Sequence, residues 1–273
     1  MRRSLTCLAA LHKARAAVHH RAGMCTFVIL RRPGHDWPVL VAANRDEMIG
    51  RPWQPPARHW RDRPEVVAGL DELAGGSWFG INDHGLLAGI LNRFGSLGPA
   101  PGVRSRGELV LEALDHADAA AAAHALANLD PKAYRTFNLI LADNHEAFWL
   151  KHADPSGTLP VELREIAPGL AMIAAGDQDD ETPRLKRYRP LFERAEPPDP
   201  PAGNWSAWEK LLADDRPDPT DGAANSMRFL TPEGFGTVSS ALVALPAPGI
   251  RRKPAFRFAA WQPKPAPWHE IPV

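Results

Sequence analysis

Short apolar segments separated by turn-forming residues are the feature that most restricts how this 273-residue chain can fold. The first two segments are residues 27–30 and 39–43, and Pro33, Gly34 and Pro38 lie between them. Short apolar runs bounded by glycine and proline predict strands, and two such runs joined by a turn predict an antiparallel hairpin. We therefore expect an antiparallel sheet to start in this part of the chain.

The same pattern recurs along the chain and predicts three further hairpins. They are residues 77–92, turned at 83–85, residues 136–151, turned at 143–145, and residues 227–245, turned at 232–234. Single strands are predicted at residues 170–175 and 255–260. Residues 51–64 are rich in proline, tryptophan and arginine and have no period, so we expect a loop there that forms one wall of a pocket.

Three helices are predicted between the hairpins. The longest covers residues 105–130, with Ser105 as N-cap, Glu108 in the capping-box position and Pro131 just after its end. The other two cover residues 182–194 and 205–213. Hairpins that flank helical blocks are typical of an α+β fold in which helices cover two antiparallel sheets.

Charge and cysteine content restrict the partners and the compartment. The chain has 32 basic and 32 acidic residues, so net charge favours neither nucleic acid nor a membrane surface as a partner. No apolar run is long enough to span a bilayer. The two cysteines, Cys7 and Cys25, are too few for a disulfide framework, which favours a reducing compartment such as the cytoplasm.

Residues 1–23 differ from the rest of the chain because they are basic and contain no acidic residue. One interpretation is a transit-like peptide, which would place the protein in an organelle matrix. The interpretation that we favour is a start codon assigned too early. In both cases we expect residues 1–23 to be dispensable for the fold and residues 24–273 to form a single domain.

Cys25 follows Met24 directly, and this position predicts a specific chemistry. If Met24 is the working start, its removal makes Cys25 the first residue, with a free α-amino group beside the thiol. That amine has a pKa of about 7.7–8.0 and can accept the thiol proton near neutral pH. The alternative is a small buried cysteine at the start of a strand.

The polar block from Asn44 to Glu47 follows the second predicted strand, and hairpin geometry would bring it close to Cys25. The Arg45 guanidinium would favour the thiolate, and the Asp46 carboxylate would orient the amine. The alternative is a structural ion pair between Arg45 and Asp46. Glu47 is expected to cap or to face solvent.

These residues resemble the NRDE family, the homologues of Transport and Golgi organisation protein 2. The blocks that carry the resemblance are Met24-Cys25-Thr26, Ala43-Asn44-Arg45-Asp46-Glu47, and residues 74–82, 91–93 and 137–139. The resemblance extends over nearly all of residues 24–273. It implies a four-layer αββα sandwich of the N-terminal-nucleophile hydrolase type. It also implies roles in lipid or acyl-CoA metabolism or in haem trafficking, which have been proposed for the family.

Residues 80–92 are also similar to the choloylglycine hydrolase and penicillin V acylase group. That similarity implies that Asn92 donates to an oxyanion, whereas we expect Asn82 to be a turn residue. Three departures from the expected pattern favour weak or absent hydrolase activity. Ala43 stands where that group has an arginine, Asp177 lies where an oxyanion asparagine is expected, and Val238 stands where many NRDE relatives have an arginine.

Two functions follow from these observations. The first is an N-terminal-nucleophile amidohydrolase or acyltransferase for small acylated amides or thioesters, in which Cys25 is the nucleophile and Arg45, Asp46 and Asn92 assist. The second is a non-catalytic binding or trafficking protein for acyl-CoA, lipid or haem on the same fold. The scattered histidines form no metal or haem motif, so no cofactor is expected.

Overall fold

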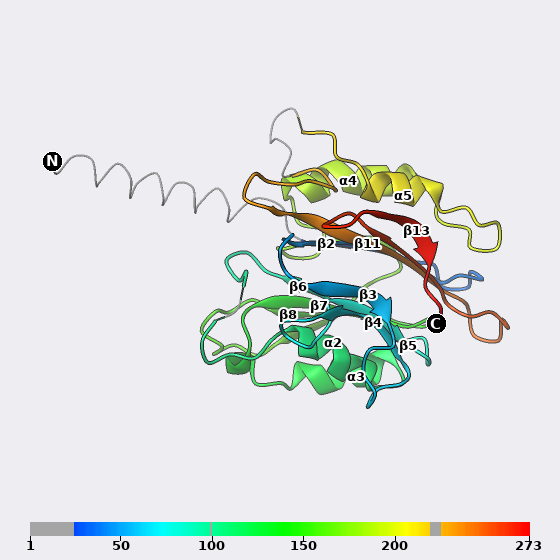
Figure 1. The fold of residues 1–273 in the computed structure, drawn as a ribbon. Coiled ribbons are helices and arrows are strands. Elements are labelled where there is room, and N and C mark those ends of the chain that lie inside the picture. The colour runs from blue at the N-terminus through cyan, green and yellow to red at the C-terminus, as the bar shows by residue number, and fades with distance from the viewer. Residues whose placement is uncertain (1–24, 99, 219–224) are drawn as a thin grey trace.

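The computed structural model describes residues 25–98, 100–218 and 225–273, which form two antiparallel β-sheets stacked face to face with helices on both outer surfaces (Figure 1). This arrangement confirms the predicted αββα sandwich. Layers of this kind form because each sheet has two apolar faces, one buried against the other sheet and one against helices.

Sheet A contains six strands in the spatial order β10-β1-β2-β11-β12-β13. Their bounds are β1 (Thr26–Arg31), β2 (Val39–Met48), β10 (Gly169–Ile173), β11 (Phe235–Leu245), β12 (Ala255–Ala260) and β13 (Ala266–Glu270). The predicted first hairpin is present, with Thr26 opposite Asn44 and Arg31 opposite Val39. Because β10 lies on the other side of β1, the strand that follows Cys25 is an inner strand of the sheet.

Sheet B contains seven strands that follow one another in chain order, from β3 to β9. Their bounds are β3 (Trp53–Ala57), β4 (Val66–Asp71), β5 (Phe79–Asn82), β6 (Leu87–Asn92), β7 (Phe137–Ala142), β8 (Ala147–His152) and β9 (Glu162–Glu165). Antiparallel neighbours can be joined by short turns, as between β5 and β6 and between β7 and β8, whereas the connection from β6 to β7 carries two helices on the outer face of the sheet.

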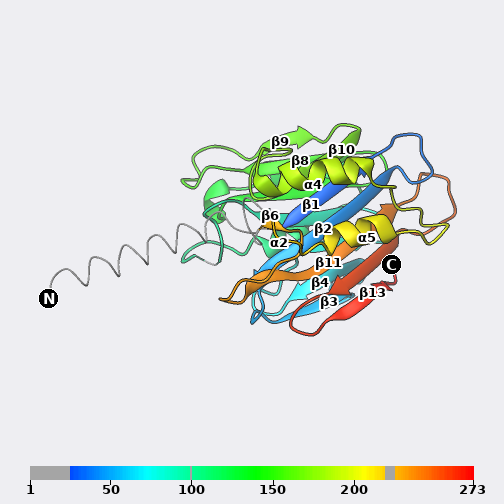
Figure 2. The ribbon, with the colours of Figure 1, turned by 90° about the horizontal axis from the view of Figure 1, so that it is seen from above.

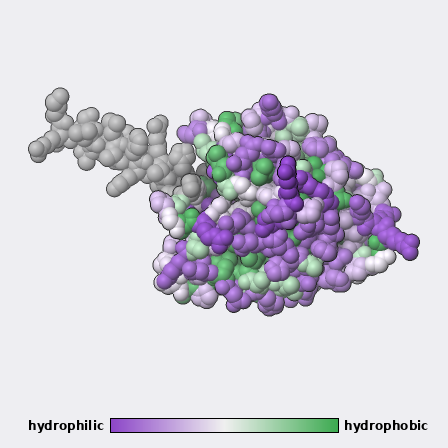
Figure 3. All heavy atoms as spheres, turned by 60° about the horizontal axis from the view of Figure 1, so that its bottom comes forward, coloured by the Kyte–Doolittle hydropathy of each residue, from purple (hydrophilic) through white to green (hydrophobic). Residues whose placement is uncertain are grey.

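Two helices cover the outer face of each sheet. On sheet A these are α4 (Pro183–Arg194) and α5 (Ser206–Leu212), which lie side by side in the view from above (Figure 2). On sheet B they are α2 (Gly107–Leu114) and α3 (Ala119–Ala127), followed by the 3-10 turn η1 (Pro131–Ala133). Figure 3 shows scattered hydrophobic residues among mostly hydrophilic ones on the face turned forward from the bottom of Figure 1.

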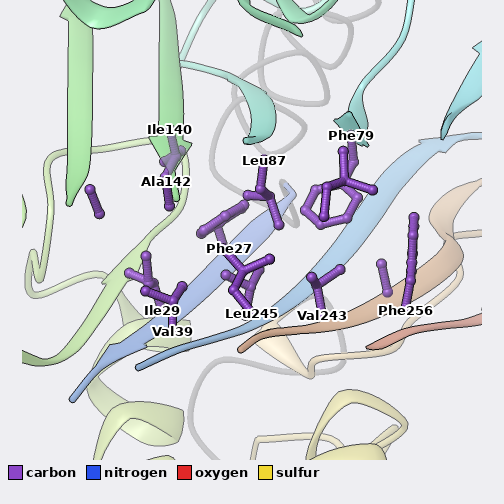
Figure 4. Close-up of a cluster of buried hydrophobic side chains, with 14 of the residues drawn as sticks. Phe27, Ile29, Val39, Phe79, Leu87, Ile140, Ala142, Val243, Leu245 and Phe256 are labelled. Carbon is purple, nitrogen blue, oxygen red and sulfur yellow. The ribbon is translucent and has the colours of Figure 1, made fainter. Parts of the chain in front are cut away.

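The central core lies between the two sheets, where side chains from both interdigitate (Figure 4). Phe27 and Ile29 of β1 point into this layer, whereas Val28 packs on the helices above sheet A. Both faces of β1 are therefore buried, which explains its continuous apolar run. Gly89 in β6 makes room for this packing, because a Cβ atom there would lie 2.7 Å from Cε2 of Phe27.

Several local predictions were wrong. The predicted helix over residues 105–130 is two helices, because Asp118 caps a new helix by accepting a hydrogen bond from the Ala121 N–H. Ser105 is not the N-cap of α2, since that position is Arg106. Residues 51–64 are not wholly a loop, because they include β3, an edge strand that tolerates proline.

No helix within residues 25–98, 100–218 and 225–273 combines the length and the apolar character that a bilayer span requires. The expectation for residues 1–23 lies outside the described residues.

Candidate active site

A pocket of about 400 Å³ opens at the end of the sandwich where β1 begins and β2 ends. Its lining comes from both sheets and from the segment that leads into α2. All four residues predicted from the sequence line this pocket, namely Cys25, Arg45, Asp46 and Asn92. The fold therefore brings together residues that lie in two separate hairpins.

Cys25 immediately precedes β1 and is partly buried. Because Thr26 lies opposite Asn44, the register places Cys25 beside Arg45 and Asp46 at the end of β2. The backbone N–H of Asp46 donates to the Cys25 Sγ at 3.3 Å, and the Sγ lies 3.6 Å from the Asp46 carbonyl oxygen. These two contacts hold the sulfur at the edge of the pocket.

The Cys25 thiol is held in its protonated form. Burial raises its pKa to about 12, and the charge of Asp46 adds to that increase. The Asp46 N–H and the Arg45 guanidinium lower the pKa, but by less than burial raises it. Arg45 thus acts in the direction predicted from the sequence without producing a thiolate, so attack by this sulfur requires a base that removes its proton.

Arg45 is buried between two tryptophan rings. Its guanidinium carbon lies 4.0 Å from the centre of the Trp78 ring and 5.9 Å from that of Trp53. Its Nη2 atom is 4.0 Å from Glu47, while its Nη1 atom is buried without a hydrogen-bond partner in the described part of the chain. A buried donor without a partner is costly unless a ligand satisfies it.

Asp46 forms its ion pair with Arg184 of α4 and not with the adjacent Arg45. Arg184 Nη1 lies 2.7 Å from Oδ2 of Asp46, and the Thr237 hydroxyl donates to Oδ1 at 2.7 Å. Successive side chains of a strand point to opposite faces, so Asp46 faces α4 while Arg45 faces the space between the two sheets. Burial raises the pKa of the Asp46 carboxyl, and Arg184 and Thr237 oppose that increase.

Arg184 and Thr237 were not predicted from the sequence. Arg184 is buried, and its Nη1 also donates to the Thr26 hydroxyl at 3.0 Å. One signal was present in the sequence. Arg184 lies on the face of α4 that carries the buried Leu185, Tyr188 and Phe192, where a charged side chain needs a buried partner.

Asn92 is the last residue of β6 and is partly buried. Leu91 points into the core between the sheets, so strand alternation directs Asn92 toward the α2 side, and Asn92 and Cys25 have in common that they line the same pocket. No group of the described residues forms a hydrogen bond with its side chain, so the amide is available to a ligand.

Asn82 has a structural role, as expected of a turn asparagine. It is fully buried, its Nδ2 donates to the carbonyls of Leu114 and His116 at the end of α2, and its Oδ1 accepts from the N–H groups of His84 and Leu86. The side chain therefore joins the β5–β6 turn to the helix layer.

Asp177, which stands where the oxyanion asparagine was expected, is part of a charge network. Arg93 Nη2 lies 2.7 Å from Oδ1 of Asp177, and Lys151 Nζ lies 3.0 Å from Oδ2. Burial works to raise the pKa of Asp177, but these hydrogen bonds outweigh it and hold the pKa below its ordinary value. The carboxylate is therefore ionised and neutralised by its own partners.

No group of three or more histidine, cysteine, aspartate or glutamate side chains among the described residues could hold an ion.

Comparison with known proteins finds a matching family model and proteins of similar sequence. The family model described as Transport and Golgi organisation 2 matches residues 24–213. The Transport and Golgi organization 2 homolog of Mus musculus is 35% identical over 108 residues, and the Homo sapiens homolog is 36% identical over 110 residues. Each match covers 38% of this chain and 38% of the relative, so the similarity spans well under half the length of these proteins.

Two solved structures share the fold at low sequence identity. The Caenorhabditis elegans ortholog of N-acylethanolamine-hydrolyzing acid amidase matches with a TM-score of 0.51 and 11% identity, over 82% of this chain and 94% of that chain. A variant of the conjugated bile acid hydrolase from Clostridium perfringens matches with a TM-score of 0.50 and 12% identity, over 90% and 92%. These similarities show the N-terminal-nucleophile hydrolase fold.

Proposed function

This chain belongs to the Transport and Golgi organisation 2 family, and on that premise we propose that it is an N-terminal-nucleophile amidohydrolase or acyltransferase for small acylated amides or thioesters. The observation that carries the proposal is the position of the Cys25 thiol. It lies at the start of an inner strand, in a pocket, beside a buried arginine and a buried carboxylate, on a fold shared with hydrolases.

In the proposed reaction, Met24 is removed and the Cys25 amine becomes the base. The amine takes the thiol proton as the sulfur attacks the acyl carbon, which forms a C–S bond and a tetrahedral oxyanion. Collapse of this intermediate breaks the bond to the amine or thiol leaving group, which receives the proton. Water then releases the acid, or an acceptor amine takes the acyl group.

The raised pKa of the Cys25 thiol agrees with this scheme, because a protonated thiol is activated only while a base removes its proton. The buried Asp46 carboxylate has lone pairs beyond those used by Arg184 and Thr237, and it would orient the amine. The Asn92 amide, which no described residue engages, would donate to the oxyanion.

The test starts with the intact mass of protein expressed from Met24, which should show loss of methionine. N-acylethanolamines and acyl thioesters are then offered as substrates to wild-type protein, to Cys25→Ser and Cys25→Ala variants, and to Ser105→Ala as a control on the exposed pocket rim. We expect turnover in wild type and in the Ser105 variant only. Full turnover by the Cys25→Ala variant would refute Cys25 as the nucleophile.

Asn92→Ala should lower kcat about 100-fold without a comparable change in KM, as expected when one oxyanion donor is lost. An unchanged kcat would remove Asn92 from the mechanism while leaving the role of Cys25 in place.

A second candidate is a binding protein for acyl-CoA, lipid or haem that has lost its chemistry. The ionised Asp177 in place of an oxyanion donor favours it. In that case the Cys25→Ala variant binds palmitoyl-CoA or haem saturably with the affinity of wild type, and neither protein turns over an acyl substrate. Absence of saturable binding by both ligands would exclude this candidate.

A further inference from the structure

Two arginines in the wall of the pocket are held only by neutral groups. Arg106 Nη1 donates to the carbonyls of Ser96 at 2.8 Å and Thr136 at 3.0 Å, and Arg135 donates to three carbonyls within residues 95–98 at 2.5 to 3.1 Å. In the portion of the chain that the structure describes, neither guanidinium has a carboxylate within ion-pair distance. The loop thus positions both cations without neutralising them.

Other arginines of the same pocket are neutralised. Arg51 lies 2.7 Å from Asp71, and Arg104 lies 2.6 Å from Glu108. The contrast shows that the uncompensated charge is local to one part of the wall. Arg45 also lines the pocket, and it is paired with Glu47 at 4.0 Å, while its buried Nη1 atom has no hydrogen-bond partner among the described residues.

Placing Arg106 and Arg135 close together has an electrostatic cost. The pKa of Arg106 falls to about 10, first because the side chain is buried and then because of the charge on Arg135. At neutral pH the Arg106 guanidinium stays charged, and it and the neighbouring cation Arg135 repel each other in the free protein. A bound anion would relieve this repulsion and use the remaining N–H donors.

We propose that the pocket binds substrates through an anionic group, a phosphate or a carboxylate, held by Arg106 and Arg135. This inference rests on the proposed function for the attack of Cys25 on the acyl group. It narrows the substrate class to acylated amines or thiols that carry such an anionic group. Guanidiniums suit this task because their planar donors match the oxygens of both anions.

The inference is tested by binding to full-length Cys25→Ala protein, which requires no turnover. Three amides with the same acyl chain are compared, namely N-decanoylethanolamine, its O-phosphate and N-decanoyl-β-alanine. We expect one or both anionic amides to bind about tenfold or more tightly than the neutral one. The arm that binds more tightly identifies phosphate or carboxylate as the group, and the preference should shrink in high salt because screening weakens charge interactions.

Variants locate the anion site. Arg106→Gln and Arg135→Gln, each made in the Cys25→Ala protein, should lose most of the anion preference, and Arg106→Lys should retain part of it. Arg104→Gln is the matched control, because that arginine lines the same pocket but is already paired with Glu108 and Glu112. Melting temperatures verify that each variant is folded.

Equal affinities for the three amides in the Cys25→Ala protein would overturn the inference even if a glutamine variant failed to fold. A preference that survives both glutamine variants would also overturn it. Anion preference without turnover in wild type would contradict the proposed function and support this inference. Turnover of the neutral amide without anion preference would support the proposed function and contradict this inference.

Discussion

Replacing Arg184 with methionine should destabilise the protein strongly, because it leaves the Asp46 carboxylate buried without its cation. The two groups lie 2.7 Å apart, and their side chains are 5% and 0% exposed. Removing one partner of a buried ion pair typically costs about 3–5 kcal/mol. For a chain of this size, about 2–4 °C of melting temperature is lost per kcal/mol, so we expect a decrease of roughly 6–20 °C.

The assay is urea and thermal denaturation followed by circular dichroism. Lys186→Met on the same helix is the control, since Lys186 and Glu181 are 69% and 87% exposed and such a pair contributes at most about 1 kcal/mol. The double variant Asp46→Asn/Arg184→Met also removes the uncompensated carboxylate charge, and it should recover at least half of the lost free energy of unfolding. A loss below about 1 kcal/mol for Arg184→Met, or no recovery in the double variant, would show that an uncompensated charge on Asp46 is not what destabilises the protein.

The deficit of Arg184→Met should depend on pH. Loss of the guanidinium raises the folded-state pKa of Asp46 further above its unfolded value of about 3.9. Below that value the Asp46 carboxyl is protonated in both the folded and the unfolded state, so it contributes no loss of stability. The loss of stability grows as the pH rises toward the folded-state pKa. Denaturation at pH 5 and pH 8 should therefore show the larger deficit at pH 8.

Three further predictions concern single residues. In protein that retains Met24, iodoacetamide should alkylate Cys25 at least about 100-fold more slowly than free cysteine at pH 7.5, because a pKa of about 12 leaves little thiolate. Mass spectrometry at equal reaction times measures both rates, and equal rates would contradict the prediction. Gly89→Ala should cost about 1–3 kcal/mol by overpacking Phe27, whereas Gly50→Ala, whose Cβ meets no atom within 4 Å, should change the free energy of unfolding little. Asn82→Ala should cost about 1–3 kcal/mol in urea denaturation, since carbonyls at the end of α2 lose their donor, and a change within error would show that water replaces it.

Part of the fold could be predicted because its signals are local. The first hairpin, the helix that begins at Pro183 and the strand at residues 255–260 were expected from apolar runs and turn residues, and the structure contains them. The strands at residues 66–71, 162–165 and 266–270 were missed. The last two lie at sheet edges and contain no buried residue, so they lack the apolar pattern on which a sequence prediction depends, whereas residues 66–71 form a largely buried inner strand.

The candidate site divides in the same way. Apolar runs and turn residues were sufficient to predict that a strand follows Cys25 and that a hairpin returns Arg45 and Asp46 to its side, because register and turn length depend on neighbouring residues. The pairing of Asp46 with Arg184, and the placement of Arg106 and Arg135 in one pocket, depend on how the sheets and helices pack. Charge pairing depends on which faces meet when sheets and helices stack, and no local spacing encodes that meeting.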